Sequence, residues 1–159
     1  FIIAVFGMTL VWPPEGTASE KDKIVIGAIE KVIIMPWHIE LPARIDSGAA
    51  RTSLDARDLK IEGKEVVFSL PAQYGGKRLR LPVKGWQQVK SSHGTTKRPL
   101  VEIDVCVGAK LITVTANLID RSQMSYPIII GRDILAKGFV VDVAKPAPTP
   151  PACPDGDRK

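Results

Sequence analysis

The feature that most restricts the fold of this sequence is an acidic turn placed directly after an apolar strand. Residues 45–49 read Ile-Asp-Ser-Gly-Ala, and residues 128–133, late in the chain, read Ile-Ile-Ile-Gly-Arg-Asp. Because Asp, Ser and Gly each favour turns, the first segment predicts a strand that ends in a turn carrying a carboxylate. The second predicts a strand buried on both faces, since its three isoleucines leave no polar side. The simpler interpretation of the first segment is an ordinary β-turn.

The acidic turn also suggests a chemistry, hydrolysis by paired carboxylates. Two carboxylates held close together cannot both ionise, so one keeps its proton, and the pair then holds a base for water and an acid for the leaving group. The chain of 159 residues is enough for one domain, so the second carboxylate must come from another subunit across a two-fold axis. Asp46 is therefore the candidate catalytic residue of a homodimer, with an acidic to near-neutral pH optimum.

The residues that follow Asp46 have roles in the same hypothesis. We expect the Ser47 hydroxyl to form a hydrogen bond across the two-fold axis. Gly48 allows the backbone to approach the partner subunit and the substrate closely. Ala49 is small and leaves room for substrate beside the carboxylates.

The late apolar segment is expected to support the acidic turn. The supporting residues are Ile129, Ile130, Gly131 and Arg132. A glycine at 131 lets the strand pack tightly against the turn. We interpret Arg132 as a structural cation that pairs with Asp133 or with an acid near the dimer interface.

Together these segments resemble the retropepsin-like aspartic peptidases, and in particular a bacterial family once labelled an ATP-dependent zinc protease. The resemblance runs from about residue 24 to residue 143 and is carried by residues 46–56, 98–103, 117–122 and 126–133. It implies a closed acid-protease barrel, peptidase activity on a peptide or protein substrate, and a homodimer without cofactor. Because relatives often occur beside ATP-grasp peptide ligases, it also implies small peptides or glutamate-tagged ends as substrates. Ala50 departs from the retroviral relatives, which carry an acid there, so their ion pair with the equivalent of Arg132 cannot form in the same way.

Runs rich in Ile, Val and Phe, separated by turns containing Gly or Pro, predict a series of short strands. The predicted strands are residues 23–34, 39–45, 65–70, 77–83, 86–91, 95–107, 110–119, 127–130 and 139–143. Residues 51–59 suit either a strand or a short helical turn, and residues 133–137 predict one helix that Gly138 ends. Short strands with a single late helix are typical of an all-β, barrel-like domain.

Two hairpins compete for the role of the flap, which in retropepsins lies between the catalytic turn and two long paired strands. Counting back from Gly131, the strands 95–107 and 110–119 take those two places, so the predicted flap tip is Ser92, His93 and Gly94. The hairpin with Gly75-Gly76 at its tip then becomes an insertion, although the two could exchange roles. His93 is a candidate for substrate contact, and a solvated turn histidine is the alternative.

Charge and composition argue against several other functions. The net charge is +5, but the basic residues are scattered and aromatic residues make up 6% of the chain, which does not suit nucleic-acid binding. A catalytic zinc site needs about three protein ligands, and the two histidines, His38 and His93, belong to no ligand motif. No phosphate-binding loop is present for ATP. We therefore expect neither a metal nor a cofactor.

The ends of the sequence are interpreted as segments outside the domain. Residues 1–12 form an apolar run that is too short to span a bilayer and suits the core of a signal peptide. Residues 1–22 are thus expected to be a signal peptide or an uncleaved membrane anchor plus linker, and the protein to be exported to a bacterial periplasm. A buried first strand is the alternative. Residues 23–144 form the predicted domain, and residues 145–159 a proline-rich disordered tail.

The two cysteines do not by themselves predict a disulfide framework. Cys106 lies in an apolar strand and is interpreted as a small buried hydrophobic residue. Cys153 lies in the tail. A disulfide between them is conceivable after export, but it is not our prediction.

Two non-enzymatic functions remain open alongside the peptidase hypothesis. The first is a non-catalytic, retropepsin-like peptide-binding module that keeps the fold and has lost the dimer, which the alanine at position 50 makes credible. The second is an adaptor whose tail recruits partners.

Overall fold

The computed structural model describes residues 23–91 and 94–153. In this part of the chain there are twelve strands, one short α-helix and one 3-10 helix, Ala72–Tyr74. In chain order the strands are β1 (Ile24–Ile26), β2 (Ile29–Met35), β3 (Ile39–Ile45), β4 (Ser53–Asp55), β5 (Arg57–Glu62), β6 (Glu65–Ser69), β7 (Arg78–Pro82), β8 (Gly85–Ser91), β9 (Gly94–Val107), β10 (Lys110–Ile119), β11 (Ile128–Ile130) and β12 (Phe139–Val141). The helix α1 is Arg132–Leu135.

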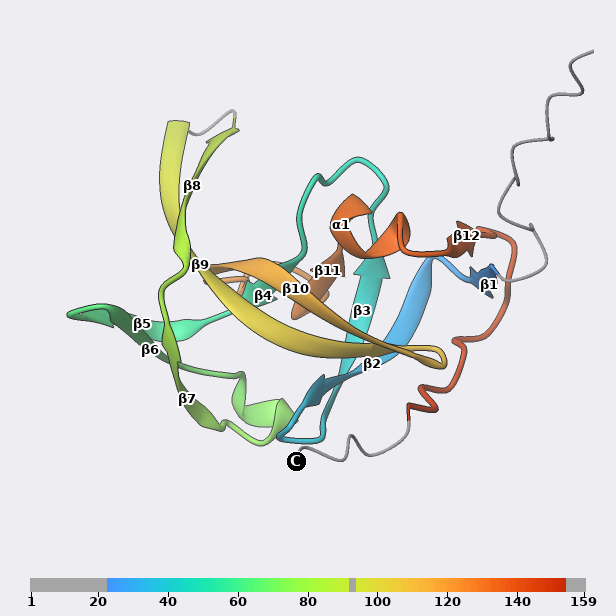
Figure 1. Ribbon diagram of the computed structural model, residues 1–159, viewed down its shortest axis with the longest axis horizontal. Coiled ribbons are helices and arrows are strands. Elements are labelled where there is room, and N and C mark those ends of the chain that lie inside the picture. Colours follow the sequence, from blue (N-terminus) through green and yellow to red (C-terminus); the bar gives the residue numbers. More distant parts are fainter. Residues whose placement is uncertain (1–22, 92–93, 154–159) are drawn as a thin grey trace, which may run out of the picture.

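One strongly curved sheet forms the body of the molecule (Figure 1). Its seven strands follow the order β10-β4-β11-β3-β2-β9-β8, and β9 also pairs with β10, which closes the strands from β10 to β9 into a ring. Buried aliphatic side chains fill this ring, among them Val32, Leu41, Leu54, Val105 and Leu118. The alternation of buried and exposed residues along these strands is the pattern of a sheet with one face on the core.

The short strand β11 lies in the sheet between β3 and β4 and is buried on one face, whereas the prediction of burial on both faces is wrong because Ile129, on its other face, is only partly buried and lines a cavity. Ile128 and Ile130 are fully buried. The strand runs parallel to β3, where Ile130 is opposite Ile45, and antiparallel to β4, where Ile129 is opposite Ser53. The strand that precedes the acidic turn and the late apolar segment are therefore direct neighbours in the sheet.

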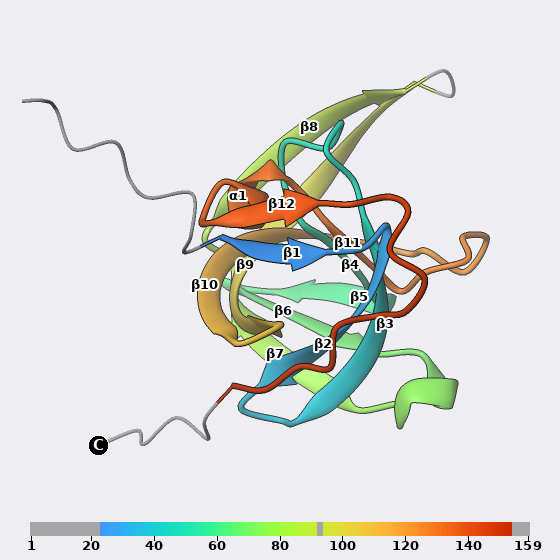
Figure 2. The ribbon, with the colours of Figure 1, turned by 90° about the vertical axis from the view of Figure 1, so that its right-hand side faces the viewer.

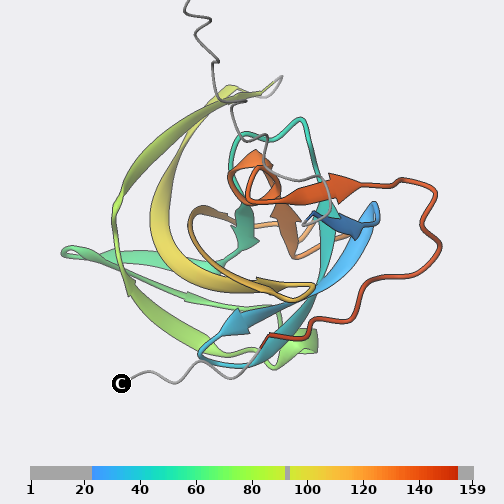
Figure 3. The same cartoon turned by 45° about the vertical axis from the view of Figure 1, so that its right-hand side comes forward.

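Two smaller sheets flank the ring (Figure 3). Strands β5, β6 and β7 form an antiparallel sheet, and β1 pairs in parallel with β12. The predicted hairpin arms 65–70 and 77–83 correspond to β6 and β7. The fold class expected from the sequence, an all-β retropepsin-like domain with one short helix near its C-terminal end, is confirmed, and the strands form a ring of paired sheet.

Several element boundaries differ from those expected. The predicted strand 23–34 is divided into β1 and β2, because the chain bends at Gly27 and Ala28, where the Ala28 carbonyl accepts a hydrogen bond from Ile45 N. Residues 51–59 contain the strand β4 and the start of β5 and no helix, and α1 begins one residue earlier than predicted. None of these shifts moves the acidic turn.

The prediction of a disordered tail from residue 145 is wrong for residues 145–153. This segment lies against the domain (Figure 2), and Cys153 forms a disulfide with Cys106. Proline-rich composition indicated disorder, but composition does not register contacts with strands far away in sequence. The expected leader, residues 1–22, and residues 154–159 lie outside the described residues. In the described part of the chain, no helix is long and apolar enough to cross a membrane.

Candidate active site

The acidic turn begins where β3 ends and is fastened to β11. The Asp46 N–H donates to the Ile130 carbonyl at 3.0 Å. The Asp46 carboxylate folds back on its own turn, where Oδ1 accepts hydrogen bonds from Gly48 N at 2.9 Å and Ala49 N at 3.2 Å. From the described residues, Oδ2 accepts no hydrogen bond. One carboxylate oxygen thus holds the turn, and the other is available to a ligand or a partner.

The exposed part of the turn is held by Arg132. Its guanidinium Nη1 donates to the Ser47 and Gly48 carbonyls, both at 2.9 Å, and its backbone N–H donates to the Ala49 carbonyl at 2.9 Å. Within the described part of the chain no ion pair joins Arg132 to Asp133, which was one of its two expected partners. Arg132 acts on backbone carbonyls and shapes the turn directly, and its predicted pairing with an acid near a dimer interface stays a prediction.

Gly131 is placed where a side chain has no room. A Cβ built on this residue lies 2.6 Å from the carbonyl carbon of Arg51, 2.8 Å from its oxygen and 3.0 Å from the Ala49 oxygen. All three atoms belong to the backbone, which cannot rotate away as a side chain can. The close packing that the sequence suggested for this glycine is therefore present in the structure.

A second set of hydrogen bonds, between Asp133 and Thr52, also holds the turn. The sequence analysis did not predict it. The Asp133 carboxylate accepts hydrogen bonds from Thr52 N at 3.0 and 2.9 Å, from Thr52 Oγ1 at 2.9 Å and from Ile134 N at 3.1 Å. Thr52 Oγ1 also accepts a hydrogen bond from Gly131 N at 3.3 Å. Thr52 is fully buried. The partners are separated by 81 positions, so no local pattern could have shown their pairing.

Replacing Asp133 by alanine is expected to lower the free energy of unfolding by about 2 kcal/mol, because the buried N–H and hydroxyl of Thr52 lose their acceptor. Asp133→Asn keeps one acceptor oxygen and should lose less. Urea denaturation followed by circular dichroism measures both. Equal stability of the alanine variant and the wild-type protein would contradict the role given to this carboxylate.

A cavity of about 200 Å3 lies beside the turn and beneath the hairpin formed by β8 and β9. Its lining residues are Ala49, Ala50, Arg51, Ser53, Gln87, Val89, Arg98, Asn117 and Ile129. Gln87 and Val89 point inward from β8, whereas their neighbours Trp86, Gln88 and Lys90 are exposed. The β8–β9 hairpin therefore shares a cavity with residues 49–51, and its role as the flap stays a prediction. Of the predicted tip, Ser92 and His93 lie outside the described residues, and Gly94 begins β9.

One wall of this cavity carries a cation without a carboxylate partner in the described chain. Arg98 Nη1 donates to Asn117 Oδ1 at 3.2 Å, and that oxygen also accepts a hydrogen bond from Ser53 Oγ at 2.8 Å. Burial lowers the pKa of Arg98 below its ordinary value. The Gln87 Oε1 is also buried and has no partner among the described residues. Both groups are suited to a polar ligand.

A second cation, Arg121, is 7% exposed. Its Nε donates to the Tyr126 carbonyl at 3.0 Å. Burial lowers the pKa of Arg121, an effect that the charges of Asp55 and Asp46 oppose and that of Arg98 reinforces. Arg121 thus shares its electrostatic surroundings with the acidic turn and with the cavity cation.

Asp55 balances part of this positive charge. The buried Asp55 carboxylate accepts a two-point hydrogen bond from Arg57, with Nε at 2.7 Å and Nη2 at 2.8 Å, and a third bond from Arg121 N at 2.8 Å. The hydrogen bonds between Asp55 and Arg57 raise the pKa of Arg57. Sequence reasoning did not place this network at the site, and the only signal for it is an acid inside the buried run Leu54–Ala56.

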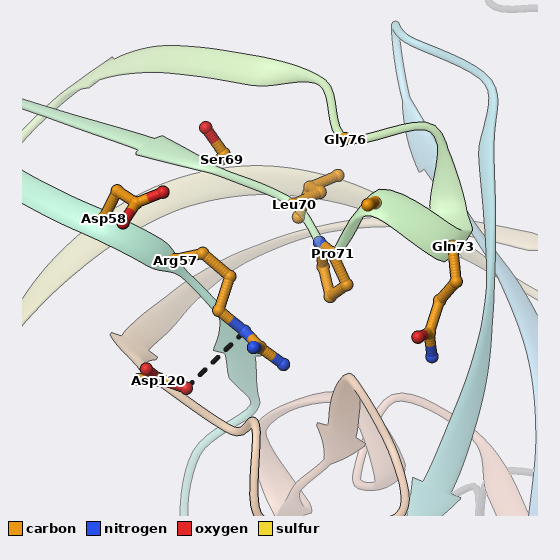
Figure 4. Close-up of a pocket in the computed structure, with 9 residues that line it drawn as sticks. Arg57, Asp58, Ser69, Leu70, Pro71, Gln73, Gly76 and Asp120 are labelled. Carbon is orange, nitrogen blue, oxygen red and sulfur yellow. Dashed lines mark ion pairs between the residues drawn. The ribbon is translucent and has the colours of Figure 1, made fainter.

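A separate cavity of about 570 Å3 lies beyond Arg57, between β5, β6 and the loop after β10 (Figure 4). Arg57 and Asp120 lie next to each other in its lining and form an ion pair, with Nε and Oδ1 3.5 Å apart (Figure 4). Hydrogen bonds from Ser122 hold the pKa of Asp120 below its usual value. The two cavities share no lining residue, and we assign the candidate site to the smaller one because residues 49–51, which follow Asp46, line it.

The fold and the turn define the class of protein. A ring of strands in which an Asp-Ser-Gly turn rests on a later apolar strand that ends in Gly-Arg-Asp is the architecture of the retropepsin-like proteins. Residues 25–148 match the family model described as RimB-like, retropepsin-like aspartic endopeptidase RimB. The chain belongs to this family, as the sequence motifs indicated.

The individual relatives carry different names. A Legionella pneumophila protein of unknown function has a solved structure with a TM-score of 0.64 and 30% identity, over 76% of this chain and 93% of that one. The simian foamy virus protease matches with a TM-score of 0.42 and 14% identity, over 68% of this chain and 91% of that one.

Two Shewanella proteins, from S. pealeana and S. halifaxensis, are each named "Probable alpha-L-glutamate ligase" and are 30% identical over 131 residues. That match covers 76% of this chain. It spans only 29% of the length of these curated relatives.

Proposed function

We propose that the protein is an aspartic endopeptidase whose two catalytic carboxylates are Asp46 of two identical subunits. The observation that carries the proposal is the geometry of the acidic turn. Asp46 Oδ1 is held by the turn while Oδ2 has no partner among the described residues. Ser47 and Gly48 are exposed next to it. A second copy related by a two-fold axis could bring an identical turn against this one.

In this proposal the paired carboxylates share one proton and divide the work of hydrolysis. The ionised carboxylate takes a proton from water, and the water oxygen bonds to the carbonyl carbon of the peptide. The protonated carboxylate supplies its proton, and the nitrogen leaves as an amine when the C–N bond breaks. The roles of the two carboxylates then reverse. Arg132 positions the turn and takes no part in the proton transfers.

Exposed apolar side chains support a dimer on the same side of the molecule. Val25 and Val140 are opposite each other in the β1–β12 pair and are 48% and 40% exposed. Ile29, 43% exposed, is opposite Arg44, two residues before Asp46. Figure 1 shows β1, β12 and α1 beside the end of β3. Burying such a surface against a second copy is a common source of dimer stability.

Two cations, the partly buried Arg98 that lines the cavity and the buried Arg121, favour a substrate with acidic side chains. Arg98 and Arg121 lose hydration in the fold, and in the described chain neither has a carboxylate within ion-pair distance. A buried charge without a partner is unfavourable, so an anionic group of the substrate would be bound tightly there. The match to part of proteins named glutamate ligases agrees with peptides that carry glutamate. We therefore propose glutamate-containing peptides as substrates.

We also propose that the protein works outside the bacterial cytoplasm. Disulfides form in oxidising compartments such as the periplasm, and Cys106 is joined to Cys153. The apolar run at residues 1–12 agrees with export.

The test measures the molecular mass in solution and the rate of peptide cleavage on the same samples. Wild-type protein is expected to be a dimer at micromolar concentration and to cleave a fluorogenic glutamate-rich peptide, with inhibition by a pepstatin-type compound. Val140→Asp places a charge in the proposed interface, and we expect a monomer with at least about 100-fold lower cleavage because the interface core excludes charge. Sedimentation equilibrium and initial rates measure the two effects.

The control is Ile61→Asp, because Ile61 is also 43% exposed but lies on β5, in a different sheet. This variant should remain a dimer and keep its activity. A wild-type monomer that cleaves the peptide excludes the shared pair of carboxylates. A stable dimer that binds peptides without cleaving any favours the non-catalytic peptide-binding module.

A further inference from the structure

The segment after β12 crosses the outside of the domain and is joined to it at both ends. We call residues 142–153 the strap. At its start Asp142 N donates to the Ile26 carbonyl at 2.8 Å, and near its end Ala152 N donates to the Gly108 carbonyl at 2.7 Å. The disulfide then ties Cys153 to β9. Figure 2 shows the strap, in red, running from β12 past β1 and β2.

Between these ends the strap is attached to a buried carboxylate. Glu30, on β2, is 1% exposed. Its carboxylate accepts hydrogen bonds from Gly27 N, from Thr149 N and from Thr149 Oγ1, the last at 3.3 Å, and Lys145 Nζ lies 4.0 Å away. Two of the three hydrogen bonds and the only nearby cation in the described chain come from the strap. The burial of Glu30 therefore depends on the strap.

Lys145 Nζ also donates to the Val25 carbonyl at 3.0 Å, and apart from such polar contacts little holds the strap in place. Its one larger aliphatic side chain, Val143, is 80% exposed. A hydrogen bond contributes modestly because water competes for the same groups, and ordering a chain segment costs conformational entropy. The prolines at 146, 148, 150 and 151 reduce that entropy cost without adding attraction. The covalent link to Cys106 is thus the main attachment.

We propose that the strap is a thiol–disulfide switch, docked over Glu30 when Cys106 and Cys153 are joined and released when they are reduced. Closing converts the two thiols and one external disulfide, R–S–S–R, into the internal disulfide and two external thiols, so two electrons and two protons pass to the external sulfur atoms. This proposal does not depend on the proposed peptidase activity.

The two cysteines differ in solvent exposure, and this difference determines which sulfur atom is attacked first in thiol–disulfide exchange. Cys106 is 1% exposed, whereas Cys153 is half-buried. An external thiolate therefore attacks Sγ of Cys153, and Cys106 leaves as a thiolate that takes up a proton. A second external thiol then removes the first from Cys153. Opening leaves the ring of strands intact, uncovers Glu30 and removes the hollow of about 400 Å3 that the docked strap forms with Ala28 and Ile29.

The test is amide hydrogen exchange on the full chain, oxidised and after treatment with a phosphine reductant. The Thr149 and Ala152 amides, both hydrogen-bonded in the docked strap, are expected to exchange at least about tenfold faster after reduction, as for a locally opened segment. The Asp46 and Asn117 amides within the ring should be unchanged. Cys153→Ser should behave like the reduced protein without any reductant, and Ala152→Ser, which keeps both cysteines, like the oxidised one.

Two results would overturn the proposal. Unchanged exchange at Thr149 after reduction would show that the strap docks without its covalent link. Loss of protection at Asp46 and Asn117 as well would show that the disulfide holds the whole domain together.

Discussion

The Asp46→Asn protein is expected to fold like the wild-type protein and to cleave peptides at least about a thousandfold more slowly, the loss typical of removing an acid–base group from a reaction centre. Asparagine keeps an acceptor oxygen at the position of Oδ1, so the hydrogen bonds from Gly48 and Ala49 can persist. What the variant loses is the ability to hold or release a proton. Initial rates with a glutamate-rich peptide and circular dichroism measure activity and fold.

Asp58→Asn is the matched control, because Asp58 is exposed and lies on β5. It should retain the wild-type rate. A mixed dimer of one wild-type subunit and one Asp46→Asn subunit, purified with two affinity tags, tests the sharing of the site. If both carboxylates serve one reaction centre, the mixed dimer is inactive. Half of the wild-type activity in the mixed dimer would mean that each subunit has its own complete site.

Gly131→Ala is expected to lower the free energy of unfolding by about 3 kcal/mol or more, the upper end of the cost of overpacking, because the added methyl group meets backbone atoms. The new Cβ would lie 2.6 Å from the Arg51 carbonyl carbon. This clash can be relieved only if residues 49–51 move away from β11. Those residues belong to the same turn as Asp46. Chemical denaturation measures the loss of stability, and we expect the remaining folded protein to be less active as well.

Gly27→Ala is the matched control for this change. Gly27 is also buried, but a methyl group added to it would lie 3.5 Å from its nearest neighbours, which is ordinary van der Waals contact. The free energy of unfolding of this variant should change by less than about 1 kcal/mol. If Gly131→Ala were as stable as Gly27→Ala, the close packing of the turn on β11 would not be a constraint on this fold.

The parts of the site that could be predicted from sequence are those that depend on local pattern. An apolar strand followed by Asp-Ser-Gly placed Asp46 on a turn, and three isoleucines in a row predicted the strand β11, whose Ile128 and Ile130 are buried while Ile129 is only partly so. Both results depend only on where apolar side chains are found and on which residues favour turns. The strand boundaries at Ile39–Ile45 and Lys110–Ile119 agree with the structure for the same reason.

Partnerships between distant residues could not be predicted in this way. Arg132 was expected beside an acid, yet it binds the carbonyls of Ser47 and Gly48, while Asp133 binds Thr52. The choice depends on the angle at which α1 leaves β11, and no local pattern encodes that angle. The strap was missed similarly, because its contacts with Glu30 and Cys106 join segments that are 119 and 47 positions apart.

The sequence by itself therefore determined the class of fold, the position of the carboxylate and the need for glycine behind it, since each follows from local preferences for burial and turns. Only the tertiary structure decided which hairpin lines the cavity next to the turn, which side chains hold the turn and that the C-terminal segment is docked. Each of these depends on contacts between residues that are far apart in the sequence. Such contacts form only when the strands pair into the ring.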